Sequence, residues 1–454
     1  MQTLSLSSVF FRTHQRWGIV LLLFLTAMVN NLDRQTLSVL APTLKGSLGF
    51  GSVEYSYIVT AFLAAYTLGY TFCGQVLDRI GVKLGMVIAL AFWSLSGMAH
   101  ACVTGWIMLA CFRFLLGLGE SFNSPGGVKA LSEWIPRKER GLCMAFFSNG
   151  NILGAVIAPP LVSFLAVKLG WQSAFLITGL SGFILLTAWM RFYHPPEKHP
   201  HLTEAERELI LTDRAAANRA ATQVEATVQP SMFSLLKNPV CIGFFFCRLL
   251  TDPITYFFSF WLPDYLQTSR GFSLAMIGMI GWLPFLASDV GGPGGGALSD
   301  WLIRRGWQSG KARLTLMIFA ASLMPLASLA VRTPSPWLAL GLIALLLGAQ
   351  SCWMANQLTL ISESIPHRQA ATLLALSAIG GSVGGMISTL LAGRFIEATG
   401  YVPVFTVLGF AHMIALLILF VSLRSKNSSR ADAGKETVTP SPDTPASPNP
   451  RLAE

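Results

Sequence analysis

The sequence has few charged residues and no cysteines at metal-binding spacing. Only 12% of its 454 residues are charged, against roughly 25% in an average soluble protein. None of the seven cysteines forms a Cys-x-x-Cys pair, and nearly all lie in apolar segments, where we expect them to pack as small hydrophobic side chains. No Walker A sequence is present, so nothing indicates a nucleotide phosphate loop. We expect neither a metal nor another bound cofactor.

Long apolar runs are abundant instead. Hydrophobic residues make up 53% of the chain, and they recur in blocks of about twenty, the length that crosses a ~30 Å hydrocarbon core. The blocks are 17–40, 53–77, 84–103, 106–131, 141–168, 171–192, 237–266, 273–302, 312–331, 336–361, 367–396 and 400–424. The N-terminal segment has no signal-peptide cleavage site, so the first block is expected to be retained. The sequence predicts an all-α membrane protein with twelve spans.

The net charge of +10 reports topology and does not indicate a nucleic-acid partner. Lys and Arg cluster in segments such as "DRIGVK", "IPRKERG" and "IRRGWQSGKAR", which alternate with loops that carry few basic residues. Those few are Lys45, Lys168, Arg270, Arg332 and Arg394. Because cytoplasmic loops carry the excess of Lys and Arg, this pattern predicts that both termini are cytoplasmic.

The spans form two similar groups of six. "GQVLDRIGVK" after span 2 matches "GGALSDWLIRRG" after span 8, and "SEWIPRKER" after span 4 matches "SESIPHRQA" after span 10. We therefore predict a half at 1–192, a charged cytoplasmic linker at 193–236, a second half at 237–424 and a disordered Pro/Ser-rich tail at 425–454. A duplicated unit of this kind places a cavity between its halves.

Four charged residues stand inside spans 1 and 4. Insertion of one ionised side chain at mid-span costs roughly 2.5–3.5 kcal/mol, so such residues normally face a cavity and are paired. Asp33 and Arg34 are about 100° apart on a helix and cannot cap each other. Arg113 and Glu120 share one face of span 4, at depths similar to those of Asp33 and Arg34, and are the expected partners. A purely structural pair of salt bridges is the alternative.

This cluster suits the import of an organic anion. An arginine fork matches a carboxylate bidentately, whereas entry of an anion into a negative-inside cell is opposed by about 2.3 kcal/mol per charge at 100 mV. Two protons, one each on Asp33 and Glu120, would make the imported charge positive. Arg248 and Asp252 are able to pair within span 7, in a role that is either structural or functional, and Asp289 and Lys129 remain open.

The repeated loops resemble the signature G-x-x-x-D-R-x-G-x-K/R of the major facilitator superfamily. The resemblance implies a two-fold, twelve-helix fold. It also implies that charges at the cytoplasmic helix ends stabilise an outward-open state. The matching residues are Gly74, Asp78, Arg79, Gly81, Lys83, Asp300 and Arg304.

"NNLDRQTLSVLAP" together with "RFLLGLGESFNSPGG" resembles the anion:cation symporter family, and "PPEKHP" and "SDWLIRRGW" resemble its bacterial hexuronate transporters. The resemblance implies that Asp33 and Glu120 are protonation sites and that Arg34 and Arg113 hold the substrate carboxylate. It further implies sugar contacts by other polar residues, which are Tyr66, Asn151, Asn356 and Gln357.

We expect a proton-coupled symporter of the bacterial inner membrane, a monomer surrounded by lipid, that imports a hexuronate such as glucuronate or galacturonate. An aldonate, glucarate, dicarboxylate or aromatic acid is the alternative substrate. A non-transporting sensor is a more distant alternative, but the tail offers no signalling domain. An enzyme is not expected, because the sequence shows no nucleophile–base set.

Overall fold

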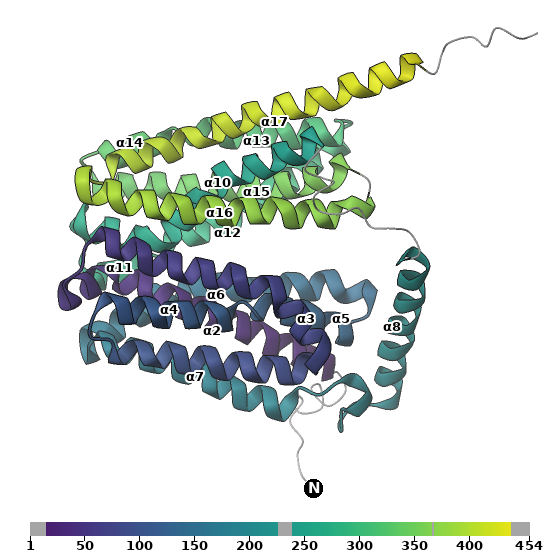
Figure 1. The fold of residues 1–454 in the computed structure, drawn as a ribbon, viewed down its shortest axis with the longest axis horizontal. Coiled ribbons are helices and arrows are strands. Elements are labelled where there is room, and N and C mark those ends of the chain that lie inside the picture. The colour runs from purple at the N-terminus through teal and green to yellow at the C-terminus, as the bar shows by residue number, and fades with distance from the viewer. Residues whose placement is uncertain (1–14, 226–237, 366, 437–454) are drawn as a thin grey trace, which may run out of the picture.

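The computed structural model describes residues 15–225, 238–365 and 367–436, and the described chain is built from helices lying side by side in two groups (Figure 1). The first group is α2 (Gln15–Leu48), α3 (Ser52–Ala99), α4 (Trp106–Glu120), α5 (Asn123–Trp134), α6 (Arg137–Leu169) and α7 (Trp171–Phe192). The second is α10 (Pro239–Thr268), α11 (Leu274–Ile280), α12 (Leu283–Arg304), α13 (Ser309–Leu323), α14 (Leu326–Arg332), α15 (Pro336–Ser364), α16 (His367–Thr399) and α17 (Val402–Glu436). We call these groups the N-half and the C-half.

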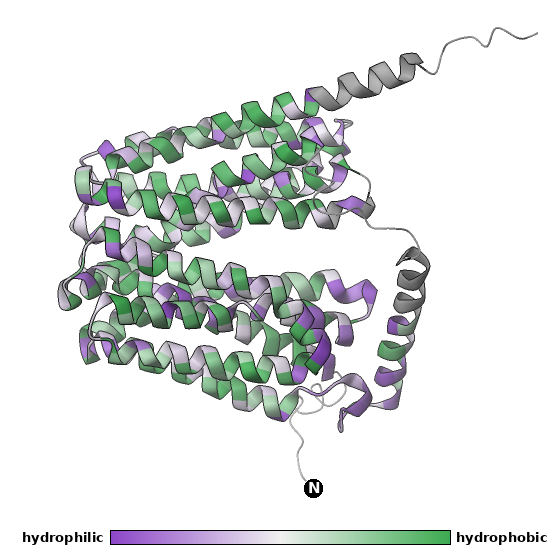
Figure 2. Ribbon diagram, in the orientation of Figure 1, coloured by the Kyte–Doolittle hydropathy of each residue, from purple (hydrophilic) through white to green (hydrophobic). Residues whose placement is uncertain are grey.

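The helices account for the twelve predicted spans. Among the described residues, nine helical segments are long and apolar enough to cross a membrane, and one of them, α3 with its 3-10 extension, reverses direction at Gly81 and supplies two spans. The two remaining spans are α2, whose polar residues lower its hydropathy, and α4 with α5. Helices α4 and α5 are each too short to cross a membrane alone, but they follow one another across a short break. Apolar residues cover the outer faces of both halves, and hydrophilic residues gather at the helix ends and on α8 (Figure 2).

Glycine turns reveal the duplication. Every described residue with a positive φ is a glycine, and the six form three pairs: Gly49 with Gly271, Gly81 with Gly306, and Gly170 with Gly400. The members of these pairs are 222, 225 and 230 residues apart. Since side chains with a Cβ are strained at positive φ, the same three turns are specified in each half.

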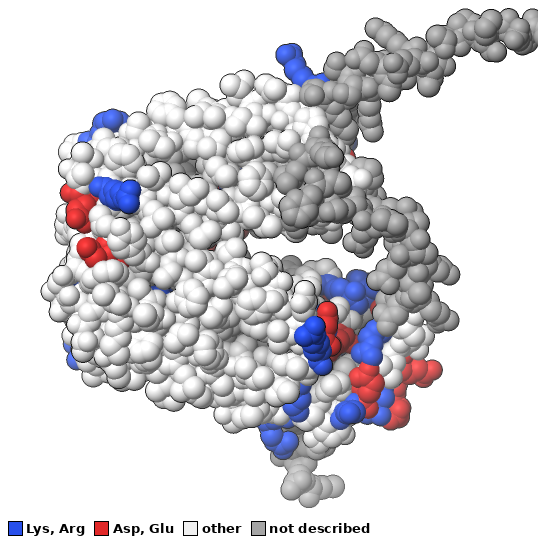
Figure 3. All heavy atoms as spheres, in the orientation of Figure 1, with Lys and Arg blue, Asp and Glu red and all other residues white. Residues whose placement is uncertain are grey.

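The halves meet at one end and separate at the other. The space-filling view shows a cleft between them that opens toward α8 (Glu204–Glu225) (Figure 3). At the opposite end, which we call the Lys45 end, the ammonium of Lys45 on α2 lies 2.8 Å from a carboxylate oxygen of Asp264 on α10. Asp264 also accepts a hydrogen bond from the Tyr401 hydroxyl. The cleft is thus closed at the Lys45 end by charged and aromatic side chains.

Backbone contacts reinforce this closure. The Ser38 hydroxyl on α2 donates to the carbonyl of Ser259 on α10 at 2.8 Å, and the Tyr55 hydroxyl donates to the carbonyl of Phe260 at 2.7 Å. The aromatic rings of Tyr55 and Trp261 meet edge to face at 4.9 Å, beneath Lys45. Helices α2 and α10 therefore touch directly near their C-terminal ends.

The predicted linker contains η2 (Pro196–Lys198) and α8, which docks on the N-half. Asp213 of α8 accepts a hydrogen bond from the backbone N–H of Arg137 at the start of α6, where an anionic group is favoured by the helix dipole. Glu206 of α8 lies 3.7 Å from Arg16 at the start of α2. Helix α17 continues to Glu436, so residues 425–436 of the predicted tail are helical, and the rest lies outside the described residues.

Candidate functional site

Close helix packing gathers the charged residues of the N-half. A Cβ added to Gly150 or Gly154 of α6 would lie 2.3 Å from a backbone carbonyl of α2, and one added to Gly117 of α4 would lie 2.6 Å from the Phe62 carbonyl of α3. Glycine is required for these approaches because any larger residue would push the helices apart. Helix α2 is thereby held against α6, and α4 against α3, with the charged side chains between them.

Arg34 and Glu120 form the predicted contact between spans 1 and 4. Two guanidinium nitrogens of Arg34 donate to one carboxylate oxygen of Glu120, at 3.1 and 3.3 Å. The guanidinium also lies 4.8 Å from the ring centre of Tyr66 and 5.2 Å from that of Phe62. The side chain of Arg34 is 26% exposed, whereas that of Glu120 is fully buried. Arg34 is therefore the charged member of this cluster that is accessible to a solute.

Asp33 and Arg113 are both buried but do not contact each other as an ion pair. Neither carboxylate oxygen of Asp33 accepts a hydrogen bond from the described residues, although Thr178 of α7 lies nearby, and the three guanidinium nitrogens of Arg113 likewise have no acceptor. Unsatisfied buried polar groups are costly and rare in folded proteins. The cluster thus retains hydrogen-bonding capacity for a proton, water or ligand.

The predicted sugar contacts are spread over both halves. Tyr66 lies against Arg34, and Asn151 is half-buried on α6, on the segment that packs against α2. Asn356 and Gln357 of α15 are fully buried. Asn356 donates to the Cys352 carbonyl, and Gln357 accepts from the Trp353 indole. No described contact joins these two residues to the N-half cluster, and their role in binding stays a prediction.

The residues of the predicted cytoplasmic gate make contacts within each half. Asp78 lies 2.6 Å from Lys129 of α5, which gives Lys129 a partner. Asp300 lies 3.8 Å from Arg313, which in turn lies 3.0 Å from Glu363. These residues stand at the α8 end, where the halves are separated, and none of the ion pairs given above reaches the opposite half. Gly74, Arg79, Lys83 and Arg304 also lie at this end of their helices.

Two further polar clusters lie in the C-half, and the first of them was predicted from the sequence. Arg248 and Asp252 pair within α10 at 2.6 Å, as their spacing allows. Gln350 of α15 joins His412 of α17 to α10, a contact that no residue near His412 in the sequence indicates. The Lys45–Asp264 contact is likewise not indicated by the sequence, in which the charge pattern places Lys45 in a loop.

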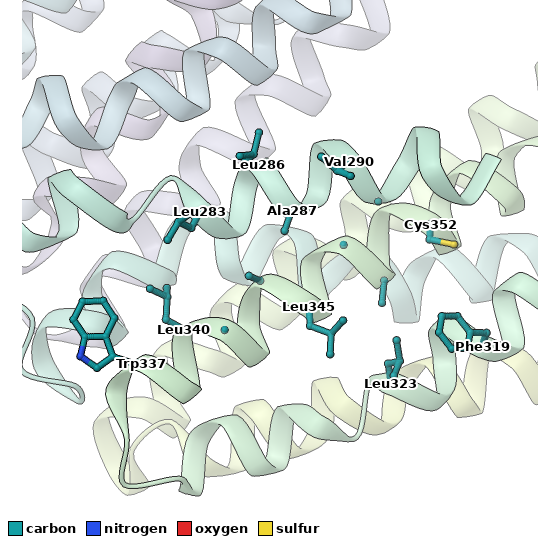
Figure 4. Close-up of a pocket in the computed structure, with 15 residues that line it drawn as sticks. Leu283, Leu286, Ala287, Val290, Phe319, Leu323, Trp337, Leu340, Leu345 and Cys352 are labelled. Atoms are coloured by element: carbon teal, nitrogen blue, oxygen red, sulfur yellow. The ribbon is translucent and has the colours of Figure 1, made fainter. Parts of the chain in front are cut away.

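An apolar pocket between α12, α13 and α15 does not suit an anion. Its lining, drawn in Figure 4, includes Leu283, Phe319, Trp337, Leu345 and Cys352, and none of its lining side chains is charged. The described residues also contain no group of three or more His, Cys, Asp or Glu arranged to hold a metal ion. The N-half cluster at the cleft is therefore the candidate site.

Comparison with known proteins identifies the family. The model of the Major Facilitator Superfamily matches residues 23–388. The chain belongs to the major facilitator superfamily. This major facilitator is 32% identical to the hexuronate transporter of Escherichia coli K12, over 90% of this chain and 94% of the relative. It is 30% identical to the probable galactarate/D-glucarate transporter GudP of Bacillus subtilis, over 91% and 92%.

Solved structures of major facilitators share the fold. A bacterial homologue of the human lysosomal transporter Spinster, in an inward-facing and occupied conformation, superposes with a TM-score of 0.67 at 16% identity, covering 91% of this chain and 96% of that one. The inward-open xylose transporter XylE of E. coli gives a TM-score of 0.67 at 15% identity, covering 89% and 95%. The fold assignment of twelve spans in two halves is thus confirmed.

Proposed function

We propose that this major facilitator imports a sugar-acid anion together with protons. The observation that carries the proposal is the partly exposed Arg34 guanidinium, held by the buried Glu120 beside a second buried acid, Asp33. An incoming carboxylate is able to replace Glu120 as the partner of Arg34, since both are planar anions that an arginine fork recognises.

Proton coupling follows from this competition. A carboxylate displaced from Arg34 inside a low-dielectric cluster is costly while ionised. Protonation of Glu120 removes that cost and frees Arg34 for the substrate. Asp33, which has no direct cationic partner among the described residues, takes a proton at still lower cost. Binding of the anion and uptake of protons therefore favour each other.

A hexuronate is the proposed substrate, because the relatives named above include a hexuronate transporter and cover nearly the whole chain. Galactarate or glucarate is the second candidate, favoured by similarity to a transporter of those diacids. We place the protein in a bacterial inner membrane, with both termini and α8 in the cytoplasm, so that the cleft opens inward. We further propose that it acts as a monomer and as a transporter, not as an enzyme.

The test is uptake of labelled glucuronate, galacturonate and glucarate into proteoliposomes, with an inward proton gradient present or absent. We expect accumulation of a hexuronate that depends on the gradient. Accumulation without a gradient would contradict proton coupling. Uptake of glucarate alone would move the substrate to the diacids, and binding of none of the three would contradict the sugar-acid assignment.

A further inference from the structure

Polar residues follow one face of α10 toward the open cleft. Ser259 and Thr255 are one helical turn apart, and so are Ser38 and Arg34 on α2. The Ser38 hydroxyl contacts the Ser259 carbonyl at 2.8 Å, and both helices run toward the Lys45 end. At 1.5 Å per residue, Arg34 and Thr255 each lie about 6 Å nearer the cleft opening. They therefore lie at about the same depth, on two helices that belong to different halves.

Thr255 is exposed, although most residues of α10 around it are buried. Its hydroxyl lies 3.2 Å from the amide nitrogen of Gln350 on α15, and the same nitrogen lies 3.0 Å from the Thr251 carbonyl. A carbonyl only accepts, so the Gln350 atom beside it is the NH₂ group and its other atom is the oxygen. The orientation of the Gln350 amide is thereby fixed.

The fixed amide also determines the state of His412. Nε2 of His412 lies 2.5 Å from the Gln350 oxygen, which only accepts, so Nε2 carries a proton and donates it. Both residues are buried, and the ring of Trp353 packs edge to face on His412 at 5.0 Å. The chain of hydrogen bonds thus runs from His412 through Gln350 to Thr255, across three helices.

The direction of this chain has a chemical consequence at the cleft. Because the Gln350 NH₂ group donates to the Thr255 hydroxyl oxygen, that hydroxyl acts there as an acceptor, and its own proton is directed elsewhere. Thr255 is exposed, so its hydroxyl proton is available to an acceptor on a solute in the cleft. A sugar acid held by its carboxylate at Arg34, at the same depth in the other half, has hydroxyl oxygens that could accept it.

We propose that the Thr255 hydroxyl donates a hydrogen bond to one hydroxyl of the sugar acid. Gln350 and His412 are positioning residues that set the direction of the Thr255 hydroxyl. The inference rests on the proposed function, since it assumes a polyhydroxy acid anchored at Arg34. It assigns anion recognition to the N-half and sugar recognition to α10 of the C-half.

The test combines substrate and protein changes in binding measurements on the purified full-length transporter. The probes are galacturonate, glucuronate and a series of analogues that each lack one hydroxyl. Thr255→Val keeps the side-chain shape and removes the donor, and Thr255→Ser restores the hydroxyl. We expect Thr255→Val to weaken hexuronate binding by roughly tenfold, the usual effect of one hydrogen bond, with little change in turnover at saturation.

One deoxy analogue decides the proposal. On the wild type and on Thr255→Ser, we expect one analogue to bind about tenfold more weakly than the parent sugar acid. On Thr255→Val, we expect that analogue and the parent sugar acid to bind equally well. Gln350→Glu keeps an acceptor for His412 but loses the NH₂ donor. We expect it to reduce the difference in affinity between the parent sugar acid and this analogue. In the double variant with Thr255→Val, we expect it to cause no further reduction. Equal losses on all analogues, or no loss, would overturn the proposal.

Failure of the proposed function is distinguishable from failure of this inference. If the wild type binds an aldonate or aldarate in place of a hexuronate, the matching deoxy series is used with the same expected outcomes. If the wild type binds hexuronates and Thr255→Val is unchanged, only the inference fails. If the wild type binds no sugar acid, both fail.

Discussion

The two halves share a fold but differ in how their buried charged groups are paired. In the N-half, Asp33, Arg113 and one oxygen of Glu120 are buried without hydrogen-bond partners among the described residues. In the C-half, Arg248 and Asp252 pair within one helix and Gln350 is bonded on both sides of its amide, although one oxygen of Asp252 and one nitrogen of His412 are also buried without partners. The difference lies in the charges: Asp33 and Arg113 of the N-half have no ion-pair partner among the described residues, whereas Arg248 and Asp252 of the C-half have each other.

The largest effect is expected from Glu120→Gln. The change removes the proton site and keeps a polar group beside Arg34, so gradient-driven accumulation should be abolished while exchange of substrate across the membrane remains. The matched variant Asp252→Asn in the C-half should retain at least half of the accumulation. Proteoliposome uptake with and without a proton gradient measures both. Loss of accumulation in both variants would remove the distinction between the halves.

A large effect on affinity is expected from Arg34→Lys. Lysine keeps the charge but loses the planar fork, so substrate affinity should fall about 30-fold or more. The same replacement of Arg248, whose partner lies on its own helix, should change affinity less than about threefold. Binding isotherms on the purified variants give the ratio. Equal losses at the two arginines would mean that the substrate also contacts the C-half charge.

An intermediate effect is expected at the Lys45 end. Lys45→Met leaves Asp264 without its cation, which should favour a state with this end open. A cysteine introduced at Ser259 should then react about tenfold faster with an impermeant thiol reagent than the same cysteine with Lys45 present. Exchanging the charges, with Lys45→Asp and Asp264→Lys, should restore the slow rate. Removal of the half-buried Arg207, which lies on α8 at the opposite end of the cleft, is the control and should leave the reaction rate unchanged.

The smallest effect is expected at the paired glycines. Gly81 and Gly306 have φ of +81° and +93°, so alanine at either should cost about 1 kcal/mol. The melting temperature in detergent should fall by a degree or two for each. Thermal unfolding, followed by intrinsic fluorescence, gives the melting temperatures of the two alanine variants. A loss at only one of them would show that the halves do not use this turn alike.

The spans and the repeat were predictable because they depend on local sequence. Runs of apolar residues set the helices, and the repeated glycines set the turns, without reference to neighbours. The Arg34–Glu120 contact was also predictable, since charges inside a span require a partner. The expected direct pairing of Asp33 with Arg113 was not found.

Contacts between distant helices were not predictable in this way. The Lys45–Asp264 pair joins the halves only in the arrangement that closes this end. The link from Thr255 to His412 depends on how three helices are rotated about their axes. Neither property follows from the periodicity of one segment, and His412 has no acid near it in sequence that would mark it.

The paired glycines bear on how such a chain diverged after duplication. Backbone positions that favour glycine occur in both copies, while the side chains between them differ. One copy holds acids and arginines between α2 and α4, and the other holds a threonine, a glutamine and a histidine in addition to its Arg248–Asp252 pair. A substitution that alters substrate preference in the C-half therefore need not disturb proton coupling in the N-half, so new specificities are able to evolve without rebuilding the energy source.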